Sequence, residues 1–333
     1  MLHFIVFLLP LLQPPISSMD IFAANKALGR GINFGNALDA PSEGAWGITI
    51  QDEWFPLIKK AGFDSIRLPV KWSAHAMKSA PYTIEPALFL RVDHLLDMAE
   101  KAGLNVVLNI HHFDELDKSP DDHQEHFLAL WRQIATRYSK RPASVYFELN
   151  NEPHDKLDDK KWNAILVKGL AVVRESNPTR PVIIGPAFWN GIWALPKLTL
   201  PADDNLIVTV HNYNPFEFTH QGAPWADAKV RNIKDKQWTG SDAELKAMRK
   251  ELDQAAEWGK KNHRPIYLGE FGAFEKAPME SRIRWTQAIV REAEARGFSW
   301  AYWEFGSGFG VYDIKKKAWR EELLKALLLE KGK

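Results

Sequence analysis

The chain has 333 residues, 14 tryptophans and no cysteine, and its 43 basic and 42 acidic residues give a formal net charge of +1. Without cysteine there is no disulfide scaffold, no iron–sulfur cluster, no zinc–thiolate site and no thiol nucleophile. The nearly neutral balance of interspersed charges argues against a nucleic-acid-binding protein, which would carry a basic face. The tryptophans are unusually many, and an indole serves either as core filler or as a flat surface for ligands.

Residues 1–18 read MLHFIVFLLPLLQPPISS and precede the patterned part of the chain. The apolar run over residues 2–12 is too short to span a membrane, and Pro10 interrupts it. It resembles the apolar part of a secretory signal, although no basic residue precedes it and Met19 is a possible translation start. Two interpretations stay open: a signal peptide, which predicts an extracellular protein, and an over-extended gene start, which predicts a cytoplasmic one. In both cases residues 19–333 form the folded domain.

Short apolar runs alternate with helical patterns along the rest of the chain. The predicted strands are Gly31–Phe34, Ser65–Val70, Leu104–Ile110, Ser144–Leu149, Val182–Gly185, Leu206–Val210, Pro265–Glu270 and Phe298–Glu304. Apolar residues at three- and four-residue spacing predict the helices, several of which stop at glycine. These are Ile50–Ala61, a helix opened by Glu85 and Pro86 and ended by Gly103, the stripe Phe127–Tyr138, Lys161–Glu175, Ala243–Lys261, Ser281–Arg296 and Glu321–Leu329.

Eight strands that alternate with helices predict a parallel sheet with right-handed crossovers. Eight such units in this length predict a closed (β/α)₈ TIM barrel in a single domain, with a doubly wound open sheet as the alternative. No GxGxxG or GxxxxGK motif follows the first strand, so nothing favours the nucleotide-binding open sheets. The link Pro186–Asn205 is the least helical. The stretch Asn212–Gly240 is the longest irregular one, and such long loops are usually functional.

Polar side chains follow most of the predicted strands, at the end where a barrel places its active site. They are Asn33 and Asn36, Arg67, His111 and His112, Asn150 to Glu152, His211 and Tyr213, Glu270, and Trp303 with Glu304. Two carboxylates across a cleft suit glycoside hydrolysis, in which one protonates the leaving oxygen and the other attacks the anomeric carbon or activates water. Arg67 and Tyr213 can keep one carboxylate ionised. Asn151 can bond a sugar hydroxyl, and Trp303 can stack on a pyranose ring.

Seven motifs carry these strand ends: GINFGNALDAPSEGAWG, IRLPVKWSAHA, LNIHH, ELNNEP, TVHNYNPFEFTHQG, IYLGEFG and AYWEFGSGFGVYD. Together, and in this order, they closely resemble glycoside hydrolase family 5. The resemblance runs from about Asn25 to about Leu328, with NEP and GEFG as its strongest pieces. By these motifs the nearest relatives look like thermophilic bacterial endoglucanases, some of which also cleave β-mannan.

The resemblance implies a retaining endo-β-1,4-glucanase in which Glu152 is the general acid/base and Glu270 the nucleophile. It implies supporting catalytic roles for Arg67, His111, Asn151, His211 and Tyr213, and substrate binding by Trp303, Asn36, Asp39, His112, His220, Trp225 and Glu304. Relatives often carry Glu where this chain has Asp39, whose side chain is shorter. The implied substrates are β-glucan, glucomannan and mannan, with a β-mannanase as the alternative main activity. We expect a monomer with no cofactor, metal, nucleic-acid or membrane partner.

Two other classes of protein compete with this interpretation. A non-catalytic sugar-binding barrel would lack one of the two glutamates, and both are present. A metal-dependent hydrolase is suggested by His111 and His112. Metal-binding barrels usually present His-x-His, however, because adjacent strand residues point to opposite sides.

The retaining mechanism predicts carboxyl groups about 5–5.5 Å apart, whereas an inverting one predicts about 6.5–9.5 Å. We also expect a raised pKa for Glu152, because the nearby Glu270 is negative. Seven tryptophans fall in predicted helices and strands and are expected to be scaffold. The other seven fall in loops or at strand ends, and among them we expect Trp303 and then Trp225 to stack on sugar, and Trp46 to pack within its loop.

Overall fold

The structure is a computed structural model that describes residues 20–328, so the predictions for residues 1–18 lie outside it. Eight parallel strands close into a barrel in chain order, with the last paired to the first. They are β1 (Arg30–Asn33), β2 (Ser65–Leu68), β3 (Asn105–Asn109), β4 (Val145–Glu148), β5 (Val182–Ile184), β6 (Leu206–His211), β7 (Ile266–Glu270) and β8 (Ser299–Tyr302). Closure confirms the predicted (β/α)₈ barrel and excludes the open sheet. Each predicted strand overlaps an observed one.

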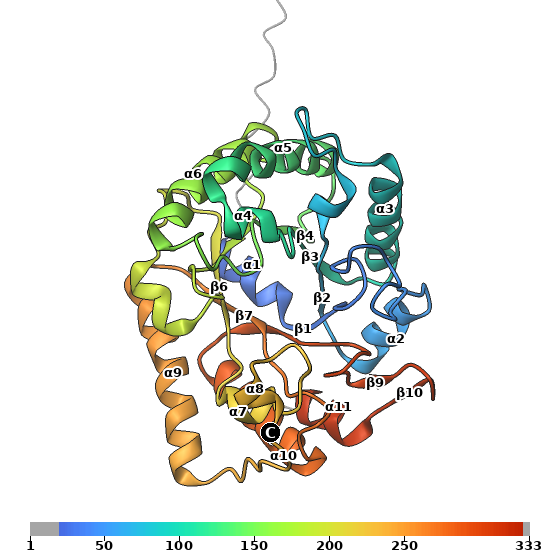
Figure 1. Cartoon of the computed structure of the whole chain (residues 1–333), viewed down its shortest axis with the longest axis vertical. Coiled ribbons are helices and arrows are strands. Elements are labelled where there is room, and N and C mark those ends of the chain that lie inside the picture. Colours follow the sequence, from blue (N-terminus) through green and yellow to red (C-terminus); the bar gives the residue numbers. More distant parts are fainter. Residues whose placement is uncertain (1–19, 329–333) are drawn as a thin grey trace, which may run out of the picture.

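Helices form a ring outside the strands (Figure 1). The longer ones are α2 (Trp54–Ala61), α3 (Pro86–Lys101), α5 (Pro120–Tyr138), α6 (Asp159–Ser176), α9 (Asp242–Lys261), α10 (Met279–Ala295) and α11 (Glu321–Leu328). Each buries an apolar stripe against the barrel. In α5, for example, Phe127, Trp131 and Ile134 are fully buried, as their spacing predicts. Between residues 20 and 328, no helix combines the length and the apolar character needed to cross a membrane.

Helix α1 (Ile21–Leu28) closes the amino end of the barrel, and the sequence analysis did not predict it. Its apolar residues pack on a floor of inward-facing side chains: Val107, Tyr146, Ile183, Ile207, Tyr267 and Ala301. Two hydrogen bonds attach it. The Asn25 side chain donates to the Ile266 carbonyl at 3.1 Å, and the Tyr146 hydroxyl donates to the Ala24 carbonyl at 2.9 Å. Because α1 precedes the first strand, the strand–helix alternation contains no signal for it.

Short elements lie in the connecting loops. They are η1 (Trp72–His75), α4 (Asp114–Lys118), η2 (Ile192–Lys197), α7 (Phe216–Thr219), α8 (Ala228–Arg231) and the hairpin β9 (Tyr312–Asp313) with β10 (Ala318–Trp319). The link Pro186–Asn205 holds only the 3₁₀ turn η2, in agreement with its weak helical pattern. The long stretch Asn212–Gly240 holds α7 and α8 and lies at the carboxyl ends of the strands, where it can contribute to a site.

Candidate active site

The inside of the barrel changes from apolar to polar over two residues along the strands, toward the carboxyl ends. Residues two apart share a strand face, so each inward side chain has a partner one layer higher. Going from the floor toward the carboxyl ends, Val107 is followed by Asn109, Tyr146 by Glu148, and Ile207 by Thr209. The upper layer therefore brings buried polar groups together directly beneath the loops.

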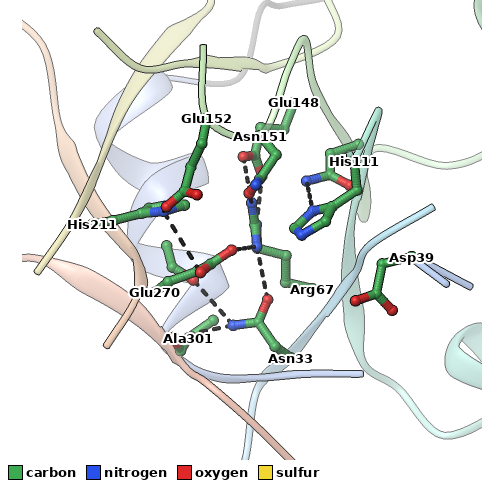
Figure 2. A network of polar contacts seen from close by, with 12 residues as sticks. Asn33, Asp39, Arg67, His111, Glu148, Asn151, Glu152, His211, Glu270 and Ala301 are labelled. Carbon is green, nitrogen blue, oxygen red and sulfur yellow. Dashed lines mark hydrogen bonds and ion pairs between the residues drawn. The ribbon is translucent and has the colours of Figure 1, made fainter. Parts of the chain in front are cut away.

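Arg67 on β2 lies at the centre of this polar layer and is fully buried (Figure 2). Its guanidinium donates to both oxygens of Glu148, each at 2.7 Å, and to Glu270 Oε1 at 2.6 Å. It also donates to Asn151 Oδ1 at 2.7 Å and to Asn33 Oδ1 at 2.9 Å. The two carboxylates raise the pKa of Arg67 against the effect of burial, so the guanidinium stays charged. The Arg67 cation thus orients the carboxylates of Glu148 on β4 and Glu270 on β7.

Glu270 ends β7 with both oxygens engaged. Oε1 accepts from Arg67, and Oε2 accepts from the Tyr213 hydroxyl at 2.9 Å. Burial raises the pKa of Glu270 and the charge of Glu152 adds to that rise, while His211, Arg67 and the Tyr213 hydrogen bond oppose it. These donors favour the ionised form. The arrangement therefore suits a carboxylate that acts as a nucleophile.

Glu152 lies in the loop after β4 and has a different environment. Its Oε1 pairs with His211 Nδ1 at 2.7 Å, and 22% of its side chain is exposed. Burial lowers the pKa of His211 to about 4, so the ring is neutral. We assign its proton to Nδ1, which donates to Glu152, and Nε2 accepts from Asn190 Nδ2 at 3.3 Å. Burial raises the pKa of Glu152 to about 7, as suits a proton donor.

The cause of this raised pKa differs from the expected one. The expected cause was the charge of Glu270, whereas burial is the largest contribution and the charge of Glu148 adds to it. The physical reason is that Glu270 already pairs with Arg67, and this cation lowers the pKa of Glu152 in turn. The direction of the predicted shift is confirmed, and its principal origin is corrected.

A cleft of about 1300 Å³ opens above the polar layer. It is lined by most of the predicted site residues: Asn36, Asp39, His111, His112, Asn151, Glu152, His211, Tyr213, His220, Trp225, Glu270 and Trp303. Within it, a carboxylate oxygen of Glu152 and one of Glu270 lie no more than 4.8 Å apart. Arg67 lies beneath the cleft and acts through the side chains that it holds.

Glu304 does not line the cleft, which corrects its prediction as a sugar contact. The strand β8 ends at Tyr302, and the chain then turns so that the Glu304 side chain is 1% exposed. Its Oε1 accepts from the backbone N–H groups of Ser307 at 2.8 Å and Phe309 at 3.3 Å. Glu304 therefore holds the loop that forms part of the cleft wall.

Asp39 lines the cleft, but its carboxylate serves its own loop. Oδ1 accepts from the backbone N–H of Ala37 at 2.7 Å, and Oδ2 accepts from that of Asn36 at 3.0 Å. Burial raises the pKa of Asp39 to about 6. Asn36 adopts a left-handed φ of 63°, and these bonds fix it there. The short Asp39 side chain thus stabilises the loop that forms this part of the cleft wall. It lies at the edge of the polar network in Figure 2.

His111 and His112 both line the cleft, which corrects the expectation that these adjacent residues point to opposite sides. The strand β3 ends at Asn109, and His112 has a left-handed φ of 49° that turns its ring back toward His111. Their ring centroids are 4.5 Å apart. His111 also stacks on Trp303, with 5.8 Å between centroids and 4° between planes. His111 thus packs between His112 and the indole of Trp303.

Two groups of side chains bring possible metal ligands within 4.8 Å of one another. One is Asp39 with His111 and His112, and the other is Glu152 with His211 and Glu270. In the first group the Asp39 oxygens already accept backbone hydrogen bonds. In the second, His211 donates to Glu152 while Arg67 and Tyr213 satisfy Glu270. In the second group, therefore, His211 Nδ1 and both Glu270 oxygens are engaged by protein partners.

The tryptophans divide between the core and the cleft. Of the seven expected in loops, five line the cleft: Trp46, Trp189, Trp193, Trp225 and Trp303. The other two, Trp72 and Trp238, are buried. Trp46 is 45% exposed and lies edge-on to His112, so it is a wall residue as well as a loop residue. Trp189 stacks on His154, two residues from Glu152.

The sequence analysis assigned no role to two further residues of the site. Glu148 lies within the apolar run of a predicted strand. A charged residue inside such a run is the one feature of the sequence that could have indicated its role. Asn190 lies in the weakly patterned link, with a left-handed φ of 54°, and donates to His211 and to the Asn151 carbonyl. No local pattern marks it, because its partners are brought to it by the barrel.

Comparisons with known proteins point to one family over most of the chain. The family model described as Cellulase (glycosyl hydrolase family 5) matches residues 29–308. Endoglucanase H from Acetivibrio thermocellus is 33% identical over 94% of this chain, which spans about a third (34%) of that protein's length. Endoglucanase C from the same organism is 28% identical, and the match covers 82% of this chain and 89% of that protein.

Solved structures agree with the same assignment. Cel5A from the hyperthermophilic Thermotoga maritima is 52% identical, with a TM-score of 0.90 over 93% of this chain and 100% of that one. Structures of that protein are described as complexes with mannotriose and with cellobiose. The family match, these relatives and the closed barrel together confirm the resemblance seen in the motifs. The chain belongs to glycosyl hydrolase family 5, the cellulase family, and its relatives are endoglucanases.

Proposed function

We propose that this chain is an endo-β-1,4-glucanase that works by a retaining double displacement. In the first step Glu152 gives its proton to the glycosidic oxygen while Glu270 attacks the anomeric carbon, so that the leaving chain departs and a glycosyl ester forms. In the second step the ionised Glu152 takes a proton from water. The oxygen of that water attacks the anomeric carbon and releases Glu270, with overall retention of configuration.

The observation that carries this proposal is the close pair of unlike carboxyl groups. One oxygen of Glu152 and one of Glu270 lie within 4.8 Å of each other, which supports the close carboxyl pair, about 5–5.5 Å apart, that a retaining mechanism requires. Arg67 and Tyr213 favour charge on Glu270, whereas burial favours the proton on Glu152. Acid and nucleophile are thus distinguished by their surroundings.

The same environment supports a change of role between the two steps. When Glu270 becomes an ester it loses its negative charge, and Arg67, which lowers the pKa of Glu152, then has one carboxylate partner fewer. The pKa of Glu152 should therefore fall in the intermediate. A lower pKa suits the general base that the second step requires.

The stereochemistry of the first product tests the mechanism. Proton NMR of a β-linked cello-oligosaccharide during cleavage should show the β-anomer before mutarotation. An initial α-anomer would overturn the retaining mechanism. As a second measurement, azide added to Glu270→Ala should restore turnover of an activated aryl glycoside and give the α-glycosyl azide, because azide then attacks in place of the missing carboxylate.

The substrate class is inferred from the relatives and from the cleft. Five tryptophans line it, and indole faces suit the apolar faces of pyranose rings. The Thermotoga protein described in complex with cellobiose and mannotriose supports β-glucan as substrate, with glucomannan and β-mannan beside it. The alternative is a β-mannanase as the main activity. Rates and product profiles on cellulosic, mixed-linkage and mannan polymers decide between them.

Two other classes have direct tests. In a sugar-binding barrel without catalysis, wild type and Glu270→Ala would be equally inactive on soluble glucan, whereas we expect only the variant to be inactive. In a metal-dependent hydrolase, chelation with EDTA would abolish activity, and we expect no loss. We further propose that the enzyme acts as a monomer and is secreted if residues 1–18 are a signal. Light scattering and mass spectrometry of the mature amino terminus test these two points.

A further inference from the structure

A carboxylate on helix α9 binds the residues on both sides of Tyr213. Glu251 is partly buried in the cleft wall, and the proposed mechanism gives it no role. Its Oε2 accepts from Asn212 Nδ2 at 3.0 Å, and its Oε1 accepts from Asn214 Nδ2 at 2.9 Å. Both oxygens are therefore occupied by amides that immediately precede and follow Tyr213.

The orientation of these amides is set by further contacts. The Asn214 backbone N–H donates to Asn212 Oδ1 at 2.8 Å, so the Asn212 amide must turn its NH₂ group toward Glu251. The Asn212 backbone N–H donates to the Glu270 carbonyl at 3.0 Å. The segment 212–214 is thus attached to β7 at one end and to α9 by its side chains, with Tyr213 between the attachments.

We propose that Glu251 is a positioning residue for the nucleophile: by holding Asn212 and Asn214 it keeps the Tyr213 hydroxyl on Glu270. The proposal rests on the proposed function, in which Glu270 attacks the anomeric carbon. Glu251 acts through Tyr213 and transfers no proton in the reaction. Glu251 holds the side chains of Asn212 and Asn214 from the twenty-residue helix α9. Trp285 Nε1 on α10 donates to the Asn214 carbonyl at 3.0 Å as a second attachment of the segment.

The charged and titratable groups that face Glu270 come from several elements. Arg67 approaches from β2, His211 from β6, Glu152 from the loop after β4, and Tyr213 from the segment 212–214. Arg67 and His211 are fixed within strands, whereas Tyr213 depends on its loop. Loss of Glu251 should therefore weaken the hydrogen bond from Tyr213 and leave the other groups in place. The ionised nucleophile then loses one donor, and its pKa rises.

Kinetics of Glu251→Ala, Tyr213→Phe and the double variant test this proposal. We expect Tyr213→Phe to lower kcat/KM by about 10- to 100-fold, as for a hydrogen bond to a charged group. Glu251→Ala should lower it by about fivefold or more, and the acid limb of its pH profile should move to higher pH. In the double variant the loss should match Tyr213→Phe alone, because the two residues act through one bond.

The matched control is Glu257→Ala, since Glu257 is an exposed glutamate on the same helix with no side-chain hydrogen bond or ion pair within residues 20–328. It should leave rate and pH profile unchanged. Glu251→Gln should retain part of the rate, because the Asn214 amide can rotate to accept from the new NH₂ group. This variant and its pH profile decide the question if Glu251→Ala does not fold.

Three results would overturn the proposal. The first is a Glu251→Ala enzyme whose rate and acid limb equal those of Glu257→Ala. The second is a double variant whose loss is the product of the two single losses, which would mean independent roles. The third is a wild type inactive on glucan and mannan, which would overturn the proposed function together with this inference. The first two leave the proposed function intact.

Discussion

The two ends of the barrel are built by the same strands and have opposite chemistry. At the amino end, Tyr146 and Ile207 pack in an apolar floor that α1 covers. One layer higher on the same strands, Glu148 and Thr209 face a polar network centred on Arg67. On these strands, two residues along the chain lead from the apolar floor to the polar layer, which holds the charged groups Arg67, Glu148 and Glu270.

This difference separates stability from catalysis within one molecule. The floor gains free energy from the burial of apolar surface and pays no cost for charge. The polar layer buries Arg67 and Glu148 completely, and a buried ion pair gains little net stability while its disruption is costly. Changes at the floor should therefore affect unfolding, and changes at the mouth should affect rate.

The largest expected effect lies at the mouth. Glu270→Ala removes the proposed nucleophile and should lower kcat by about 10⁴-fold or more. Since Arg67 keeps Glu148 as a partner, the free energy of unfolding should fall far less than activity does. Initial rates on soluble glucan and urea unfolding of the same preparation measure both. A variant that loses stability and rate in parallel would contradict the separation.

Glu148 lies where the two regions meet and should affect both. Glu148→Gln leaves the buried Arg67 with one carboxylate and should cost about 3 kcal/mol in the free energy of unfolding. It should also lower kcat/KM, because Arg67 is then free to shift relative to Glu270. Glu322→Gln, in an exposed pair with Lys325, is the control and should change neither. An unaltered unfolding midpoint for Glu148→Gln would show that the pair adds no stability.

A change in the apolar floor should lower the free energy of unfolding and leave the catalytic rate unchanged. Leu28→Ala removes a fully buried side chain from α1 and should cost about 2–4 kcal/mol in the free energy of unfolding. At temperatures where the variant stays folded, kcat/KM should be unchanged. Leu90→Ala on α3, where the side chain is 65% exposed, serves as the control for stability. A large loss of rate in Leu28→Ala would mean that the floor controls the mouth.

The pH dependence should report the environment of Glu152. Its pKa of about 7 predicts that kcat/KM falls as pH rises through 7, because the ionised carboxyl has no proton to donate. In Glu270→Gln the cation Arg67 has one carboxylate partner fewer, so it should lower the pKa of Glu152 further than in the wild type. NMR titration of labelled glutamate in both proteins measures this difference. Equal pKa values would show that the two carboxyl groups are not coupled.

The smallest effect is expected at the exposed wall. Trp225 is 62% exposed and contacts Phe274 edge-on, with 5.0 Å between ring centroids. Trp225→Ala should raise KM for oligosaccharides by about fivefold through lost stacking, with kcat nearly unchanged. Phe22→Ala, exposed at the opposite end, should alter neither constant. If Trp225→Ala lowers kcat at constant KM, the indole would act in the transition state instead.

The sequence predicted the barrel well because its signals are local. Apolar runs and helical stripes mark strands such as β4 and helices such as α5, and the alternation defines the fold. It predicted Glu152 and Glu270 for a related reason: both follow apolar strands at the end where a barrel forms its site. Helix α1 was not predicted, because it lies before the first strand and outside the alternation of strands and helices.

The sequence by itself therefore determined the fold class and the family and predicted the two glutamates, since each depends on residues close together in the chain. Only the tertiary structure decided that Glu304 turns beneath its loop, that His112 faces the cleft and that Glu251 reaches the neighbours of Tyr213. These outcomes depend on where strands end and on which distant side chains then meet. No spacing along the chain encodes that, because the contacts form only when the barrel closes.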